Sequence, residues 1–230
     1  MTKPSIIPAM IHAIIFDFDG LIFDSETPDF ISWQETYGAH GVELSRELWN
    51  AHIGTITFDP YLHLEELLGR PIDRDAVWAK RKARDNELLA AQTIMPGVED
   101  YLAEVRELGL KFAIASSSKH SWVDRHLKRL GLFEQFDLIF CSDDVGNVGK
   151  PDPAVYQAAI AALGIAPQNG LALEDSPNGV TAAKGAGLWC TAVPNRMTRD
   201  LNFDHADYRL NALTDMPLSQ LITEVMNGTS

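Results

Sequence analysis

Two aspartates directly follow an apolar run near the start of the chain. Residues 14–20 read IIFDFDG, so Asp17 and Asp19 are separated by one residue and are followed by Gly20. Ionised carboxylates at the end of a buried strand are costly unless a partner compensates them. A divalent cation would do so, because hard cations take oxygen ligands. A strand that runs into an Asp-Gly turn would give the same pattern, so this segment alone predicts either a metal site or a turn.

The composition of the chain narrows the classes of protein to which it can belong. Its 230 residues allow a substantial core, and 46% hydrophobic with 22% charged residues is typical of a soluble globular protein. The net charge of −13 argues against binding nucleic acid or an anionic membrane, which needs a basic surface. We expect Cys141 and Cys190 to be reduced core residues. No signal-peptide pattern or long apolar run is present, so a cytoplasmic protein is expected.

Five short apolar runs alternate with segments of helical periodicity. Each run is continuous rather than alternating, which is typical of strands buried in a parallel sheet. The alternation predicts the α/β class with a doubly wound parallel sheet, in which ligands bind beyond the carboxyl ends of the strands. The predicted strands are the run before Asp17 and residues 111–118, 137–142, 170–175 and 188–194, and the predicted helices are 98–108, 123–130, 154–163 and 180–186.

Residues 24–94 differ from the rest of the chain. They contain no convincing strand, and their aromatic and leucine residues recur at helical spacing. We therefore predict a helical insert, which divides the chain into a core domain of residues 1–23 and 95–230 and a second domain of residues 24–94. The aromatic residues are expected to form the insert's own core. Met95-Pro96-Gly97 marks the return to the core domain.

Four segments together resemble the motifs of the haloacid dehalogenase superfamily. They occur in the order that this superfamily requires, and each lies at or near the end of a predicted strand: 16–26 (FDFDGLIFDSE), 115–119 (ASSSK), 149–153 (GKPDP) and 173–179 (LEDSPNG). The helical insert occupies the place of the superfamily's C1 cap. The resemblance is greatest to the β-phosphoglucomutase-like branch, which includes phosphosugar phosphatases. It implies a Rossmann-like core and a cap hinged near residues 22–25 and 94–97.

The resemblance assigns different work to the two aspartates. Asp17 is implied to be the nucleophile, whose attack on phosphorus gives an aspartyl-phosphate. Asp19 is implied to protonate the leaving oxygen and then to activate water. The two carboxyl groups therefore need environments that separate their pKa values.

The same resemblance implies a magnesium ion. Asp17, the backbone carbonyl of Asp19 and Asp175 would hold Mg²⁺, with Glu174 as a direct or an outer ligand. Ser116 and the backbone amide of Ser117 would bind the substrate phosphate, although a serine run can also cap a helix. Lys150 would add a positive charge to that phosphate. Ser176 and Asn178 are expected to shape the metal loop or a turn.

The cap departs from the pattern of β-phosphoglucomutase itself. Asp29 stands where that mutase has a histidine, and the neighbourhood of its cap arginine reads GTITF around Thr55. Lys82 matches a cap lysine, although a solvated helix face would explain it equally well. These three residues are candidates for substrate specificity.

The prediction is a Mg²⁺-dependent phosphatase of small phosphomonoesters, with sugar phosphates as the expected substrates. A phosphomutase and, less favoured, a dehalogenase remain as alternatives. The expected partner is a small phosphorylated metabolite, with no nucleic acid and no membrane, and the chain is expected to act as a monomer or weak dimer.

Overall fold

The computed structural model describes residues 10–50 and 58–228. Within these residues a six-stranded sheet has the order β3-β2-β1-β4-β5-β6, and every neighbouring pair is parallel. The strands are β1 (Ala13–Phe16), β2 (Lys111–Ala115), β3 (Leu138–Phe140), β4 (Gly170–Glu174), β5 (Trp189–Ala192) and β6 (Tyr208–Arg209). The predicted α/β class with a parallel sheet is confirmed. The predicted strands are present but shorter, and the two-residue β6 was not predicted.

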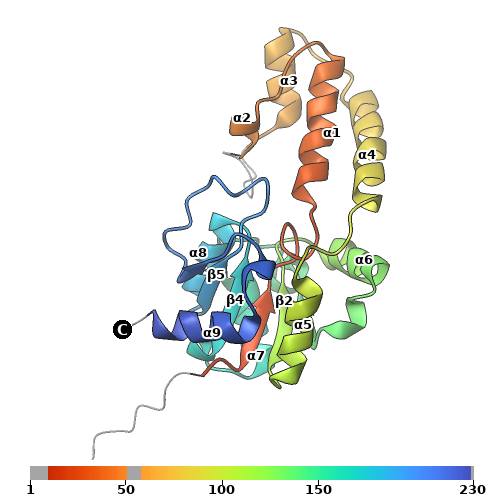
Figure 1. Cartoon of the computed structure of the whole chain (residues 1–230). Coiled ribbons are helices and arrows are strands. Elements are labelled where there is room, and N and C mark those ends of the chain that lie inside the picture. The colour runs from red at the N-terminus through yellow and green to blue at the C-terminus, as the bar shows by residue number, and fades with distance from the viewer. Residues whose placement is uncertain (1–9, 51–57, 229–230) are drawn as a thin grey trace, which may run out of the picture.

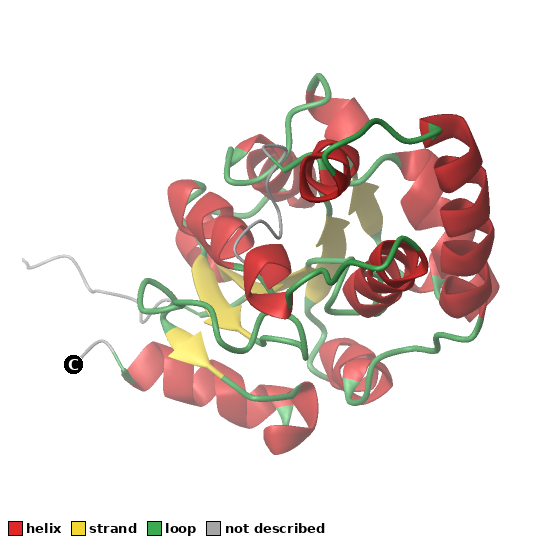
Figure 2. Ribbon diagram, turned by 90° about the horizontal axis from the view of Figure 1, so that it is seen from above, coloured by secondary structure: helices red, strands yellow, loops and turns green. Residues whose placement is uncertain are grey.

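Helices cover both faces of the sheet, as Figure 2 shows from above. The side chains of Ile14 and Phe16 enter one buried cluster, and those of Ala13 and Ile15 enter another, because successive residues of a strand face opposite ways. The first cluster includes residues of α5 (Val98–Glu107), α6 (His120–Leu130) and α9 (Leu218–Asn227). The second includes residues of α7 (Ala154–Leu163) and α8 (Pro177–Gly185). The connections contain the 3₁₀ helices Phe133–Gln135, Ser142–Val145, Pro167–Asn169 and Leu213–Asp215.

Four helices stand apart from the sheet, at the top of the molecule in Figure 1. They are α1 (Glu26–Ala39), α2 (Arg46–Asn50), α3 (Pro60–Leu68) and α4 (Arg74–Ala90). Their aromatic and aliphatic side chains form a separate cluster that includes Trp33, Tyr37 and Trp49, as expected for the insert's own core. Met197, from the loop after β5, joins the same cluster. The insert therefore also packs on the core.

The sequence explains where α3 and α4 begin. The side chain of Asp59 accepts hydrogen bonds from the amides of Tyr61 and Leu62, and Pro60 occupies the first turn of α3. The side chain of Asp73 accepts from the amide of Ala76 at the start of α4. No helix in the described ranges is long and apolar enough to span a bilayer.

The two segments that connect the insert to the core lie side by side. Phe23 and Ile94 form an antiparallel bridge, and the amide of Met95 donates to the carbonyl of Ile22 over 2.9 Å. The chain therefore leaves the core and returns to it at one place. The domain boundaries at residues 24 and 94 remain a prediction, and so does hinge motion there.

Candidate active site

The four motifs meet at the carboxyl ends of the parallel strands. Asp17 directly follows β1, Ser116 follows β2, and Asp175 follows β4. They line a cavity of about 710 Å³ together with Lys150, and side chains of α1 and α4 line it as well. The cavity therefore has one wall from the core and one from the insert. We call them the core wall and the cap wall.

Lys150 joins Asp17 of the core wall to Glu174, which is fully buried and does not line the cavity. Its ammonium Nζ lies 2.5 Å from Oδ1 of Asp17 and 2.6 Å from Oε1 of Glu174. All three side chains are buried, with exposed fractions of 6% for Lys150, 8% for Asp17 and 0% for Glu174. Burial disfavours the ammonium, but the two carboxylates outweigh this and raise the pKa of Lys150. The lysine is therefore a fixed positive charge beside Asp17.

Glu174 is held by the protein on both of its oxygens. Its Oε1 also accepts from the hydroxyl of Tyr156 over 2.5 Å, and its Oε2 accepts from Ser176 over 3.4 Å. A side chain at Gly179 would place its Cβ 1.9 Å from Oε2, so only glycine leaves room for this carboxylate. Glu174 therefore positions Lys150 and also lies within reach of Asp17 and Asp175, so its role as a direct or an outer metal ligand stays a prediction.

Asp175 is oriented by Asn195, a residue outside the four motifs. The amide Nδ2 of Asn195 donates to Oδ2 of Asp175 over 2.7 Å and to the carbonyl of Gly20 over 3.2 Å. Gly20 has φ of +81°, and a Cβ there would lie 2.2 Å from Oδ2 of Asp175. The turn after β1 can therefore approach Asp175 only because residue 20 is glycine. Its carboxylate is thereby held in the group that also contains Asp17 and Glu174.

Asp19 points to a different set of donors from Asp17. Its Oδ2 accepts from the hydroxyl of Ser118 over 2.6 Å and from that of Ser116 over 3.4 Å. Its Oδ1 accepts from the indole Nε1 of Trp122 over 2.8 Å. Asp17 faces a cation and Asp19 faces neutral donors, so the two carboxyl groups have the unlike environments that the sequence predicts.

Three carboxylates crowd together at the core wall. One carboxylate oxygen each from Asp17, Glu174 and Asp175 lies within 4.8 Å of the others. Burial, opposed by Lys150 and aided by the charges of Glu174 and Asp19, raises the pKa of Asp17 to about 8. Burial and the charges of Asp17 and Glu174 also raise the pKa of Asp175. Bringing these groups together ionised requires a compensating positive charge.

The donor set fits a divalent cation. When ionised, these three carboxylates carry two more negative charges than the ammonium of Lys150 offsets. Oxygen ligands of this kind suit Mg²⁺. The residues that would hold it are Asp17, Asp175 and the backbone carbonyl of Asp19, which the predicted ligand set includes.

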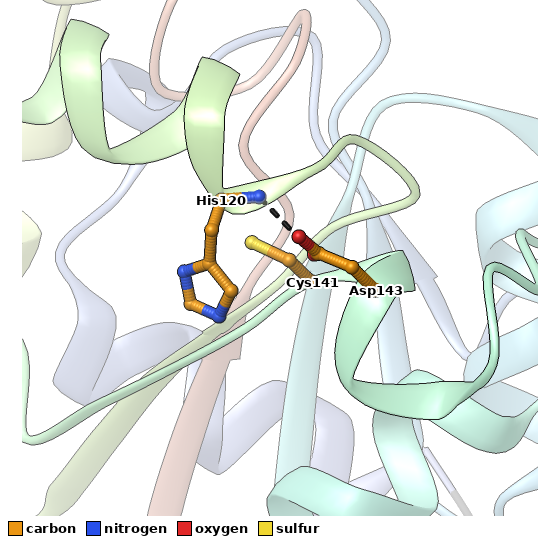
Figure 3. A group of neighbouring side chains, drawn as sticks. All are labelled: His120, Cys141 and Asp143. Atoms are coloured by element: carbon orange, nitrogen blue, oxygen red, sulfur yellow. Dashed lines mark hydrogen bonds between the residues drawn. The ribbon is translucent and has the colours of Figure 1, made fainter.

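A second group of possible metal ligands lies at the start of α6. Figure 3 shows His120, Cys141 and Asp143, with the backbone amide of His120 donating to Asp143 over 3.1 Å. The ring nitrogens of His120 contact Asp124 and Asp144 instead, at 3.0 and 2.8 Å. Burial raises the pKa of the Cys141 thiol to about 12, which keeps it protonated and a poor ligand. These contacts connect the start of α6 to the 3₁₀ helix Ser142–Val145.

The cap wall contains two pairs of opposite charge. Arg81 donates to Asp29 over 2.6 Å and to Ser32 over 3.1 Å, and its guanidinium lies 4.7 Å from the ring centre of Trp33. Lys82 donates to the buried Asp85 over 2.8 Å. The candidates Asp29 and Lys82 therefore line the cavity, each with an opposite charge.

Some predicted residues have other positions or lie outside the described ranges. Thr55 falls in residues 51–57, which the structure does not describe. Ser176 caps α8, since its hydroxyl accepts from the amide of Gly179. The hydroxyl of Ser117 accepts from the amide of Lys150 over 2.9 Å and so ties two motifs together. The serine run is not the cap of α6, whose N-cap residue is Lys119.

The comparisons with known proteins agree with this architecture. A family model described as haloacid dehalogenase-like hydrolase matches residues 11–187. "Putative phosphatase YhcW" of Bacillus subtilis (strain 168) is 43% identical over 214 residues, covering 93% of this chain and 97% of that protein. "Phosphorylated carbohydrates phosphatase" of Thermotoga maritima is 29% identical over 187 residues, covering 77% and 82%. The crystal structure of CbbY from Rhodobacter sphaeroides in complex with phosphate superposes with a TM-score of 0.70 at 30% identity, covering 92% and 99%.

These matches confirm the predicted resemblance, the Rossmann-like fold and the predicted enzyme class, a phosphoric monoester hydrolase. The chain belongs to the haloacid dehalogenase-like hydrolase family.

Proposed function

We propose that this protein is a Mg²⁺-dependent phosphatase that hydrolyses small phosphomonoesters through an aspartyl-phosphate. The observation that carries the proposal is the pairing of Asp17 with Lys150 at 2.5 Å, beside a second carboxyl group in an unlike environment. The lysine can neutralise the charge of a phosphoryl group as that group meets the nucleophile.

In the first step, an oxygen of Asp17 forms a bond to phosphorus and the bond from phosphorus to the leaving oxygen breaks. Asp19 gives its proton to the leaving oxygen, so the alcohol departs neutral. Lys150 and the hydroxyl of Ser116 bind the equatorial oxygens of the phosphoryl group.

In the second step, water attacks phosphorus and the bond to Asp17 breaks. Asp19, now a carboxylate, takes the proton from that water and is ready for the next cycle. Bound Mg²⁺ supplies charge that shields the anionic nucleophile from the anionic phosphate. Asn195 orients Asp175 for that ion, and Glu174 fixes the position of Lys150.

The cap wall favours hydrolysis over mutase chemistry. A mutase intermediate carries a second phosphate, which needs uncompensated positive charge in the cap. The cations that α4 contributes to the cavity lining, Arg81 and Lys82, are paired with Asp29 and Asp85. Alternating carboxylates and cations suit the hydroxyl groups of a sugar better than a second phosphate. Sugar phosphates are therefore the proposed substrates, and the phosphorylated carbohydrates in the Thermotoga relative's name support this choice.

The test is hydrolysis by the purified protein. With Mg²⁺ it should release phosphate from members of a panel of sugar phosphates and from 4-nitrophenyl phosphate, and EDTA should abolish the release. Asp17→Asn should lower the rate at least about 10³-fold, because the nucleophile is lost. The matched control is Asp200→Asn, an exposed aspartate far along the chain, which should retain full activity. An active Asp17→Asn enzyme would overturn the mechanism.

Two further assays separate the alternatives. β-Glucose 1-phosphate with a glucose bisphosphate primer should yield free phosphate, whereas glucose 6-phosphate as the main product would indicate a mutase. Halide release from 2-chloropropionate, unaffected by EDTA, would indicate a dehalogenase.

A further inference from the structure

Trp122 makes a contact with the acid/base group that none of the four motifs includes. The residue lies in the first turn of α6, and its indole Nε1 donates to Oδ1 of Asp19 over 2.8 Å. The other oxygen of Asp19, Oδ2, lies 2.6 Å from the hydroxyl of Ser118 and 3.4 Å from that of Ser116. The two oxygens of one carboxyl group therefore have different kinds of partner.

The difference between these partners decides which oxygen of Asp19 can exchange a proton. An indole N–H is a donor only, so Oδ1 must accept from it whether the carboxyl group is protonated or not. A serine hydroxyl can donate to a carboxylate and can accept from a carboxylic acid after it rotates. Ser118 can therefore keep its hydrogen bond to Oδ2 whether that oxygen is protonated or not. Trp122 can keep its hydrogen bond to Oδ1 only while Oδ1 carries no proton.

We propose that Trp122 is a positioning residue for the acid/base step. Its N–H fixes Oδ1 of Asp19, so that Oδ2, on the side of Ser116, is the oxygen that gives the proton to the leaving group and later takes it from water. The proposal rests on the proposed function, in which Asp19 performs this proton transfer.

The surroundings of Trp122 make it suitable for this task. Its ring lies 4.3 Å from the ring of His126 between centres, and the guanidinium of Arg125 lies 5.2 Å from its centre. On the cap side, Nζ of Lys82 lies 5.9 Å from the same ring. An indole held by neighbours on several sides can hold a carboxyl group in one orientation better than a mobile side chain can. It also touches both walls of the cavity.

The test variant is Trp122→Phe, which keeps an aromatic ring and removes only the N–H donor. The matched control is Trp189→Phe, because the indole of Trp189 also donates a hydrogen bond, to the carbonyl of Gln168 over 3.0 Å, outside the cavity. Both variants remove one indole donor, so a general loss of stability affects them alike.

The measurement is kcat/KM for a series of aryl phosphates, from 4-nitrophenyl to phenyl and 4-methoxyphenyl phosphate. A good leaving group departs with little help from an acid, whereas a poor one depends on it. Trp122→Phe should lower kcat/KM about 10-fold for phenyl phosphate and less than about 2-fold for 4-nitrophenyl phosphate. The larger value is a part of the roughly 10²–10⁴-fold that general acid catalysis supplies. Its plot of log kcat/KM against leaving-group pKa should therefore be steeper than that of the wild type or Trp189→Phe. An equal loss for all esters would overturn the proposal.

A second readout does not depend on activity. In a ¹⁵N–¹H spectrum, Trp122→Phe identifies the indole signal of Trp122 among those of the five tryptophans. Asp19→Ala should move that signal and leave the Trp189 signal in place. An unmoved Trp122 signal would show that the contact is absent, and this too would overturn the proposal. Failure of the wild type to hydrolyse any ester would instead refute the proposed function.

Discussion

The core wall and the cap wall of the cavity are built in different ways. In the core wall, Asp17 and Lys150 are nearly inaccessible to water, and Lys150 pairs with Asp17 and with the fully buried Glu174. The cap wall contains the pairs Arg81–Asp29 and Lys82–Asp85, and one member of each pair is partly open to water. The side chain of Asp29 is 41% exposed and that of Lys82 is 34% exposed. Charges act more strongly where water is excluded. The core wall is therefore suited to catalysis, and the cap wall to selection among substrates.

This difference gives separate expectations for the two walls. A change in the core wall should lower kcat for every substrate, because it removes stabilisation of the transition state. A change in the cap wall should alter KM and the ratio between substrates, with little effect on kcat. A core-wall variant that changes only KM, or a cap-wall variant that lowers kcat for every substrate, would contradict this division.

After the loss of the nucleophile in Asp17→Asn, the largest effect is expected for Lys150→Met. The variant removes the ammonium that faces Asp17 and the phosphoryl group, so kcat/KM for 4-nitrophenyl phosphate should fall at least about 10²-fold. The control Lys184→Met loses a more exposed pair with Asp207 and should keep its activity. Thermal unfolding of both variants shows whether the loss comes from unfolding. A folded Lys150→Met enzyme with a normal rate would contradict the assignment.

A smaller and more specific effect is expected for Asn195→Ala. Asn195 orients a predicted ligand without binding the ion itself, so the Mg²⁺ concentration for half-maximal activity should rise about 10-fold. Saturating Mg²⁺ should restore most of kcat. Asn202→Ala is the control, because Asn202 and Asn195 each accept from a backbone amide two residues further along the chain, and Asn202 does not line the cavity. An unchanged Mg²⁺ requirement would show that Asn195 does not support Mg²⁺ binding.

In the cap wall, Arg81→Gln should act on binding. The pair with Asp29 is partly exposed, and about 1 kcal/mol is an upper value for such pairs, so KM for sugar phosphates should change by about 5-fold or less. The value of kcat should stay within about 2-fold. Arg84→Gln, which loses pairs with Glu35 and Glu87 outside the cavity, should change neither constant. A collapse of kcat in Arg81→Gln would show that the cap takes part in the chemistry.

The last prediction concerns stability rather than activity, at His126 of α6, whose ring stacks on that of Phe23 beside the join with 4.7 Å between ring centres. Burial, together with the positive charges of Arg125 and Arg129, lowers the pKa of His126 to about 4. An unfolded histidine titrates near 6.5. Between pH 6.5 and 4 the unfolded chain therefore binds more protons than the folded chain, so the free energy of unfolding decreases as the pH is lowered. From pH 7 to pH 5 the wild type should lose about 1–2 kcal/mol more than His126→Phe, measured by urea unfolding. An equal loss in both proteins would show that His126 is protonated as readily in the folded state as in the unfolded state, which would contradict the lowered pKa.

The sequence predicts the core wall well because its motifs stand at strand ends. A parallel sheet brings the carboxyl ends of neighbouring strands together, so Asp17, Ser116 and Asp175 can be placed without knowing the packing. The edge of the sheet is predicted less well. Two residues of β6 give no detectable pattern, and α9, although Leu218, Leu221 and Val225 recur at helical spacing, is not among the predicted helices.

The residues that support the motifs are harder to predict. Trp122 contacts Asp19 from 103 positions away, and Asn195 reaches Asp175 across 20 positions. Such contacts depend on how a helix or loop packs, and no spacing rule encodes this. A weak signal exists for Asn195, a polar residue shortly after a predicted strand. The pairing of Arg81 with Asp29 likewise depends on the packing of α1 against α4.

The bridge between Phe23 and Ile94 has a consequence for how new substrate preferences could arise. Because the insert departs and returns at adjacent points, its length and helices can change without shifting the register of β1 against β2 and β4. A different insert with similarly spaced ends could be transplanted onto the same catalytic sheet. The join thus permits a modular molecule, in which the proposed reaction centre is kept while the insert proposed to select the substrate is exchanged.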